Sequence, residues 1–344
     1  KFMKLKYIFL AFVSIIALSS CSDTDTTVAE TVPTYDMSGF AKGADVSWVT
    51  EMEAAGTKFY DANGRETECL KLLKSMGVNS IRLRVWVDPT DGWNDKQDVL
   101  AKALRAKDLG FRVMIDFHYS DSWADPAHQT KPAAWTNDNL DQLKVDVAKH
   151  TTDVLQTLKD KGVDVEWVQV GNETPTGMLW KEGTYSDTDK SSFAQLINAG
   201  YDAVKSVYPN AQVIIHVDKG NLLGRFTWLF DGLKANGAKW DVIGMSLYPE
   251  DSDWETETND CLSNIKTLED RYGCKVVLSE VGMPWDSENA EAFMTKLVTG
   301  CKAIDGCLGV FYWEPECYNS WEGYSKGVFD NSGKATSTLN IFKK

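Results

Sequence analysis

Eight short runs rich in β-branched and apolar residues recur along the chain, and their spacing constrains the fold more than any other feature. They lie at residues 42–48, 78–86, 111–119, 165–173, 212–218, 240–248, 275–281 and 306–313. Successive runs start between 28 and 54 residues apart, which leaves room for a helix and two loops each time. Strands joined by such crossovers are parallel, so the sequence predicts repeated β-helix-β units.

The segments between the runs show helical periodicity. Residues 67–76, 99–109 and 140–158 place apolar residues at intervals of three and four, and a glycine follows each of them (Gly77, Gly110 and Gly162). No G-x-G-x-x-G follows the first run, which weakens the case for an open dinucleotide-binding sheet. Eight units of this kind favour an α/β fold closed into a single (β/α)8 TIM barrel over an open doubly wound sheet.

The first twenty residues have a basic start and an apolar run at 7–18 that is too short to span a bilayer, so we expect a secretory signal. The ending Leu-Ser-Ser-Cys21 resembles a bacterial lipoprotein box, and we expect lipid attachment at Cys21; the alternative is an ordinary signal that contains a cysteine. Residues 21–38 then form the lipidated cysteine and a flexible tether, and residues 39–344 the catalytic domain. This organisation predicts an extracytoplasmic protein anchored to a bacterial outer membrane or cell surface by lipid alone.

The charge balance argues against a nucleic-acid partner. The chain has 36 basic and 50 acidic residues, a net charge of −14. Without the three lysines of the signal, 33 basic residues face 50 acidic ones, a net charge of −17. Nucleic-acid binding depends on Lys and Arg that neutralise phosphates, so this class of partner is excluded.

Six cysteines follow Cys21, namely Cys69, Cys261, Cys274, Cys301, Cys307 and Cys317. An oxidising compartment permits disulfides, and the crowding of five cysteines after residue 260 predicts at least one local bridge, in a pairing that the sequence leaves open. No Cys-x-x-Cys occurs and the four histidines are scattered, so no zinc site is expected.

Polar residues collect where the predicted strands end, and in a barrel those ends form one mouth. They are Arg82, Arg84, Trp86, Asp116, His118, Ser120, Asn172, Glu173, His216, Asp218, Tyr248, Glu280, Trp313 and Glu314. Glu173 and Glu280 close the fourth and seventh apolar strands, where an unpaired carboxylate costs several kcal/mol to bury. A salt bridge could account for one of them, and a catalytic pair accounts for both.

Two carboxylates across a barrel mouth are what glycoside cleavage requires. An aldolase needs a lysine at a strand end, and none of the eight ends carries one. A phosphate-binding barrel needs a glycine-rich loop after the seventh or eighth strand, where this chain has Pro284-Trp285 and Pro315-Glu316. Isomerases and other barrel chemistries remain alternatives at this point.

Several longer motifs resemble glycoside hydrolase family 53, the endo-β-1,4-galactanases. The motifs are GADVSW at 43–48, RLRVWV at 82–87, DFHYSDSWADPAHQ at 116–129, GNE at 171–173, SE at 279–280 and FYWEP at 311–315. They cover most of the chain from residue 41 to 330, and the 116–129 motif is the most specific. The resemblance implies a retaining (β/α)8 enzyme that hydrolyses the β-1,4-galactan side chains of pectin (type I arabinogalactan) by double displacement.

The resemblance also implies roles for individual residues. Glu173 is expected to be the general acid/base and Glu280 the nucleophile, with carboxyl groups ~5–5.5 Å apart. Asn172 is expected to hold the sugar 2-hydroxyl, Arg84 to keep Glu280 ionised, Tyr248 to bond Glu280, and Trp313 to stack under the sugar. The remaining substrate-binding candidates are Trp86, His118, Asp121, Trp123 and His128. His216 and Asp218 are as consistent with filling the barrel interior as with binding the sugar.

Two departures from the family pattern concern the loops. The sixth strand ends Met-Ser-Leu-Tyr-Pro, without the aromatic residue that usually precedes Tyr-Pro, and residues 317–329 are short where some relatives have a longer loop associated with calcium. We therefore expect no cofactor and no metal; a hard cation at Asp286, Glu288 and Asn289 is the alternative to a solvated acidic loop.

The sequence therefore predicts a monomeric, lipid-tethered endo-β-1,4-galactanase that acts on galactan and galacto-oligosaccharides. Two alternatives stay open. One is a related endo-glycanase acting on β-mannan or β-glucan, and the other is a glycan-capture lipoprotein without catalysis.

Overall fold

A computed structural model describes residues 37–344, and these residues form a closed barrel of eight parallel strands. The strands are β1 (Ala41–Asp45), β2 (Ser80–Val85), β3 (Arg112–Phe117), β4 (Trp167–Val170), β5 (Gln212–Val217), β6 (Val242–Leu247), β7 (Lys275–Val281) and β8 (Cys307–Trp313). Each strand pairs with the next, and β1 pairs with β8 to close the barrel, with Ala44 opposite Tyr312. The predicted (β/α)8 barrel is confirmed.

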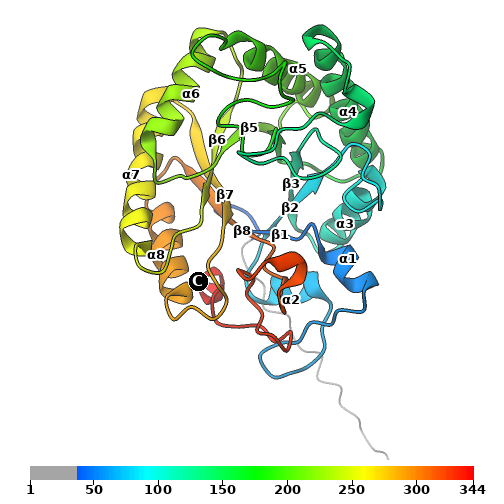
Figure 1. The fold of residues 1–344 in the computed structure, drawn as a ribbon. Coiled ribbons are helices and arrows are strands. Elements are labelled where there is room, and N and C mark those ends of the chain that lie inside the picture. The colour runs from blue at the N-terminus through cyan, green and yellow to red at the C-terminus, as the bar shows by residue number, and fades with distance from the viewer. Residues whose placement is uncertain (1–36) are drawn as a thin grey trace, which may run out of the picture. The chain divides into compact units, whose positions relative to one another are not determined.

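Helices follow the strands in alternation and form a ring outside them (Figure 1). They are α1 (Val49–Ala54), α2 (Cys69–Ser75), α3 (Lys96–Asp108), α4 (Leu140–Asp160), α5 (Ser191–Val207), α6 (Leu223–Ala235), α7 (Trp254–Tyr272) and α8 (Ala290–Lys302). Three short 3-10 helices, η1 (Ala133–Trp135), η2 (Trp321–Gly323) and η3 (Asn340–Lys343), lie in the loops and at the C-terminal end. Among residues 37–344, none of these helices has the length and apolar character needed to cross a bilayer.

The three helices predicted from periodicity correspond to α2, α3 and α4. Helix α3 begins three residues earlier than predicted because the Asp95 side chain accepts hydrogen bonds from the backbone N–H groups of Gln97 and Asp98. The Asn139 side chain caps α4 in the same way through Gln142 N–H. Polar caps thus determine where these helices begin, whereas the apolar pattern determines which face they bury.

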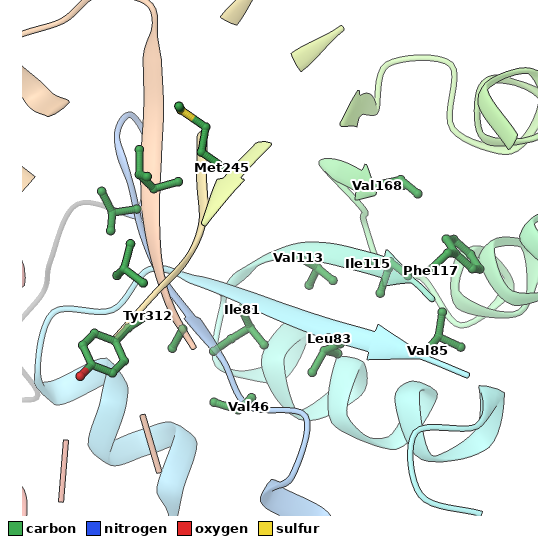
Figure 2. Close-up of a cluster of buried hydrophobic side chains, with 14 of the residues drawn as sticks. Val46, Ile81, Leu83, Val85, Val113, Ile115, Phe117, Val168, Met245 and Tyr312 are labelled. Atoms are coloured by element: carbon green, nitrogen blue, oxygen red, sulfur yellow. The ribbon is translucent and has the colours of Figure 1, made fainter. Parts of the chain in front are cut away.

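Strand alternation divides the barrel residues into two sets. On β2, Ile81, Leu83 and Val85 point outward to the helices, and the two arginines between them point inward. Figure 2 shows these outward side chains beside their counterparts on neighbouring strands. Each buried side chain of this size stabilises the fold by ~1.5–3 kcal/mol. The sheet therefore gains its stability on its outer face and leaves its inner face available for polar residues near the mouth.

A smaller apolar cluster fills the inside of the barrel on the side away from the mouth. It consists of Ala41, Met114, Trp167, Ile214, Val242, Val277 and Phe311, all buried. The interior is thus packed rather than open, as in other barrels of this size. This packing closes the bottom of the barrel, so the polar interior residues are accessible only from the C-terminal ends of the strands.

The predicted local disulfide is wrong. Cys69, Cys261, Cys274, Cys301, Cys307 and Cys317 are all free thiols in the structure, and all except the half-buried Cys274 are buried. They pack as small apolar side chains against the core between the sheet and helices α2, α7 and α8. Their clustering in sequence therefore reflects core packing, which sequence spacing alone does not distinguish from a bridge.

The predicted signal at 1–20, Cys21 and most of the predicted tether at 21–38 lie outside the described residues. Their assignment stays a prediction. The part of the predicted catalytic domain that carries the barrel, from residue 41 onward, is described in full.

Candidate active site

Glu173 lies in the sharp turn that follows β4. Gly171 has a φ of 87°, and a Cβ there would come within 2.8 Å of the Thr174 side chain, so only glycine fits. Glu173 itself has a φ of 40°, a left-handed conformation that is rare outside glycine and clusters at functional sites. This turn directs the Glu173 carboxyl group into the barrel mouth, where Ser246 Oγ donates a hydrogen bond to its Oε1 at 2.6 Å.

Glu280 lies within β7, opposite Ser246 of β6, at a shift in the register between these strands. Its Oε2 accepts a hydrogen bond from the Tyr248 hydroxyl at 2.8 Å, and its Oε1 lies 2.9 Å from Nη2 of Arg82. The predicted contact between Tyr248 and Glu280 is therefore present. The Glu280 side chain is 8% exposed, so the arginine and the phenol supply the partners that a buried carboxylate needs.

The arginine that pairs with Glu280 is Arg82, and the predicted role for Arg84 is wrong. Arg84 forms its ion pair with Glu314, which follows β8. Both arginines point inward because they are two residues apart on one strand, so alternation alone could not distinguish them. Arg84 lies closer to the mouth, and its guanidinium carbon lies 4.4 Å from the ring centroid of Trp123 and 5.0 Å from that of Trp48.

The surroundings of the two glutamates separate their proton affinities. Burial and the negative charge of Glu280 raise the pKa of Glu173 well above its usual value, and the Ser246 hydrogen bond only partly opposes the rise. Burial raises the pKa of Glu280 to about 7, with Arg82 and the Tyr248 hydroxyl acting against the rise. Two interacting carboxyl groups of this kind share a proton, and the contact of Arg82 with Glu280 favours Glu280 as the ionised member of the pair.

A cavity of about 430 Å³ contains both glutamates at the barrel mouth. Five other predicted substrate-binding residues line it as well: His118, Trp123, Asn172, Tyr248 and Trp313. The structure thus brings seven predicted site residues, from strands β3, β4, β6, β7 and β8 and the loops that follow them, to one space large enough for a sugar ring.

Four predicted residues do not line this cavity. Arg84 lies buried beneath the tryptophans, and Trp86 donates its indole N–H to His118 Nδ1 at 3.2 Å. Asp121 accepts hydrogen bonds from the backbone N–H groups of Asp88 and Ala133, which ties two loops together. His128 is exposed and pairs with Asp125. These side chains support the walls of the cavity or lie beyond its edge.

An aromatic cluster forms one wall of the cavity. Trp48, Trp123 and Trp313 have ring centroids 5.3–5.9 Å apart, and Tyr324 lies 4.7 Å from Trp313 in an edge-to-face contact. Such contacts hold flat rings in fixed orientations. The wall is therefore a rigid apolar surface beside two carboxyl groups, which suits the apolar face of a sugar.

Sequence reasoning missed Asp125, Tyr324 and Lys326, which also line the cavity. Tyr324 and Lys326 come from the loop after β8. The sequence indicated that this loop is short but did not single out any residue in it. Lys326 Nζ lies 5.4 Å from the ring centroid of Tyr248, at the edge of the site. Long loops reach the mouth by paths that strand periodicity does not encode.

Within residues 37–344, no group of three or more His, Cys, Asp or Glu side chains is placed to hold a metal ion. In the 286–289 loop, the Asn289 backbone N–H donates to the Ser287 hydroxyl, which in turn donates to Asp251. The expectation of no cofactor or metal, with calcium as the alternative, stays a prediction.

Two carboxyl groups in one cavity at the C-terminal mouth of a (β/α)8 barrel are the arrangement that glycoside cleavage requires. The family model for glycosyl hydrolase family 53 matches residues 41–342. The chain belongs to glycosyl hydrolase family 53 and is a glycoside hydrolase, and the family resemblance seen in its motifs is confirmed.

Curated relatives and solved structures agree with this assignment. The endo-beta-1,4-galactanase of Bacillus subtilis is 34% identical over 80% of this chain and 70% of its own length. The arabinogalactan endo-beta-1,4-galactanase of Thermothelomyces thermophilus is 31% identical over 88% of this chain and 98% of its own length. A fungal beta-1,4-galactanase structure has a TM-score of 0.83 at 29% identity, covering 89% of this chain and all of that one. The GH53 catalytic domain of Ignisphaera aggregans has a TM-score of 0.80 at 32% identity, covering 91% and 97%.

Proposed function

We propose that the chain is an endo-β-1,4-galactanase that cleaves the galactan side chains of pectin and releases galacto-oligosaccharides. The observation that carries the proposal is the cavity that contains both Glu173 and Glu280, in a chain whose relatives are named as galactanases. The net charge of −14 also suits a neutral polysaccharide better than an anionic polymer.

The proposed reaction is a double displacement with retention at the anomeric carbon. Glu280 attacks that carbon while Glu173 gives its proton to the departing glycosidic oxygen. The attack forms an ester between Glu280 and the sugar. Glu173, now ionised, takes a proton from water as the water attacks the same carbon and releases Glu280. The raised pKa of Glu173 supports its role as the acid of the first step.

The cavity lining suggests how the sugar is held. Trp313 provides the flat surface beneath the ring under attack, and the axial 4-hydroxyl of galactose leaves one ring face more apolar for such stacking. Asn172 faces the 2-hydroxyl, and its side chain is fixed by hydrogen bonds from Arg82 and to the backbone oxygen of Ala124. Trp123, which is 36% exposed, extends the apolar surface toward a neighbouring subsite.

Digestion assays test the substrate and the endo action together. Purified protein is incubated with pectic galactan, β-mannan and β-glucan, and products are separated over time. The proposal predicts a ladder of galacto-oligosaccharides from galactan and little release from the other two. Preferential release from mannan or glucan would reassign the substrate, and binding to galactan without products would make the protein a glycan-capture module.

We also propose that a lipid on Cys21 tethers the monomeric enzyme at the outer membrane or cell surface. The sequence before Cys21 motivates this proposal. Metabolic labelling with a fatty acid should label the wild type and not Cys21→Ser, and the variant should leave the membrane fraction. Equal labelling of both would contradict the lipid attachment. Light scattering during gel filtration of the soluble variant tests whether the protein is a monomer. A measured mass twice that of one chain would contradict the monomeric state.

A further inference from the structure

We propose that Ser246 and His216 form a hydrogen-bond relay that positions Glu173, holding Oε1 so that Oε2 is the oxygen that transfers the proton. Neither residue is among the two glutamates or the predicted sugar-binding residues. The proposal deepens the proposed function and rests on it for the role of Glu173 as acid and base.

The relay is a chain of short contacts beneath the cavity. Ser246 Oγ, on β6, lies 2.6 Å from Glu173 Oε1 and 2.8 Å from His216 Nε2, on β5. Ser246 is 2% exposed and His216 fully buried, so no solvent competes for these groups. Ser246 thus links a histidine of the adjacent strand to one oxygen of the glutamate.

The number of protons determines the direction of each hydrogen bond. A serine hydroxyl has one proton to donate, and an ionised carboxylate can only accept. When Glu173 acts as the base, Ser246 must donate to Oε1, and its contact with His216 is satisfied only if Nε2 carries a proton and donates to Oγ. The relay therefore requires the Nε2–H tautomer of His216.

The other ring nitrogen, Nδ1, lies beside both a hydrogen-bond donor and an acceptor. Gln169 Oε1 accepts from Arg82 Nε at 2.8 Å, which fixes the amide so that its Nε2 lies 3.0 Å from His216 Nδ1 and can donate to it. Asn172 Oδ1 lies 2.9 Å from the same Nδ1 and is already bonded by Arg82 Nη2. A proton on Nδ1 would suit Asn172, and Nε2 would then take the Ser246 proton away from Glu173.

Burial and the charge of Arg82 favour a neutral ring for His216. Burial, with Arg82 next in effect, holds the pKa of His216 well below its usual value; Asp116 opposes this and His118 adds to it. The groups that face Glu173 are Glu280 on β7, Asp218 after β5 and Arg82 on β2, besides Ser246. A neutral His216 lets the relay keep one arrangement through both halves of the reaction, while only Oε2 gains and loses a proton.

Kinetics of Ser246→Ala test the positioning role. We expect kcat/KM on galactan to fall on the order of tenfold, since a hydrogen bond to a charged group is lost. The basic limb of the pH profile should move to higher pH, because the hydroxyl lowers the pKa of Glu173. Ser246→Thr keeps the hydroxyl and should restore both.

The matched control is Ser279→Ala, which removes a buried strand hydroxyl that has no hydrogen-bond partner in the described structure. It should leave the basic limb in place. A Ser246→Ala variant with unchanged activity, or with a loss that is uniform in pH, would overturn the proposal.

Nitrogen-15 NMR of histidine-labelled protein tests the relay without any substrate. The His216 signals, assigned by their change in Ser246→Ala, should show a proton on Nε2 and none on Nδ1 both above and below the basic-limb pKa. A proton on Nδ1, or a doubly protonated ring, would overturn the relay. Because this readout does not involve galactan, a failed relay is distinguishable from a wrong substrate.

Discussion

Arg82 and Glu280 are joined by a contact of 2.9 Å between Nη2 and Oε1, and the same nitrogen lies 2.9 Å from Asp116 and from Asn172. The other terminal nitrogen lies 2.6 Å from Asp45. One buried guanidinium therefore connects side chains from β1, β3 and β7 and from the turn after β4. The fork of donors holds the Glu280 carboxylate in a fixed orientation and supplies the charge that opposes its protonation.

Replacing Arg82 should change the acidity of the nucleophile. Arg82→Gln removes both the charge and the fork, so we expect kcat on galactan to fall at least roughly 10- to 100-fold. Because the charge of Arg82 lowers the pKa of Glu280, the acid limb of the pH profile should move to higher pH. Arg84→Gln is the matched control: Arg84 pairs with Glu314, so the acid limb of this variant should stay in place. The opposite pattern would return the role to Arg84.

The pH profile of the wild type should be bell-shaped. Activity needs Glu280 ionised, so it falls as pH drops through the acid limb, which should lie above the usual pKa of Glu because burial raises the pKa of Glu280 to about 7. Activity also needs Glu173 protonated, so it falls as pH rises through the pKa of Glu173, which burial and the charge of Glu280 raise well above its usual value. Initial rates between pH 4 and 10 give both limbs, which belong to the pair as a whole. An acid limb near 4 would be incompatible with this environment.

Variants of the two glutamates should differ with the leaving group. Glu280→Gln removes the attacking oxygen and should lower kcat on the order of 10⁴-fold or more on every substrate. Glu173→Gln should lose roughly 10²- to 10⁴-fold on galactan. Its first step should be nearly normal on an aryl β-galactoside with a good leaving group, which departs without a proton.

Glu166→Gln is the matched control for both glutamate variants. Glu166 pairs with Arg112. Arg112 is the first residue of β3, so the pair lies at the end of the barrel away from the mouth. It should keep the wild-type rate. Equal losses in Glu173→Gln on both kinds of substrate would show that this residue is not the acid.

Trp313 should act mainly on transition-state binding. Loss of an aromatic stacking surface in Trp313→Ala should lower kcat/KM roughly 10- to 100-fold on galactan. Trp313→Phe keeps a ring and should recover part of the loss, while thermal unfolding of both variants controls for the contacts with Trp48 and Tyr324. A recovery by leucine as complete as by phenylalanine would argue against stacking.

The barrel was predictable because its signals are local. Alternation on β2 places Ile81, Leu83 and Val85 outward, and glycines such as Gly77 and Gly110 mark where helices end. The polar caps Asp95 and Asn139 determine the helix starts, and the apolar pattern alone did not include them. The free cysteines were not predictable, because a buried thiol and a bridged one have the same spacing.

The site was predictable where a residue ends a strand and not where two candidates share a face. Glu173, Glu280, Asn172 and Tyr248 reach the cavity from positions that periodicity fixes. Arg82 and Arg84 differ only in height along β2, and the partner of each depends on the radius and register of the closed barrel. Tyr324 and Lys326 reach the cavity through a loop whose path depends on tertiary contacts.

The most direct test of the paired-glutamate account is the configuration of the first product, followed by proton NMR of the anomeric signals during early hydrolysis of galactan or a galacto-oligosaccharide. Attack by Glu280 and then by water, each with inversion, predicts that the β-anomer appears first and the α-anomer only later by mutarotation. Initial formation of the α-anomer would contradict the account, because it would mean a single displacement by water without a bond to Glu280.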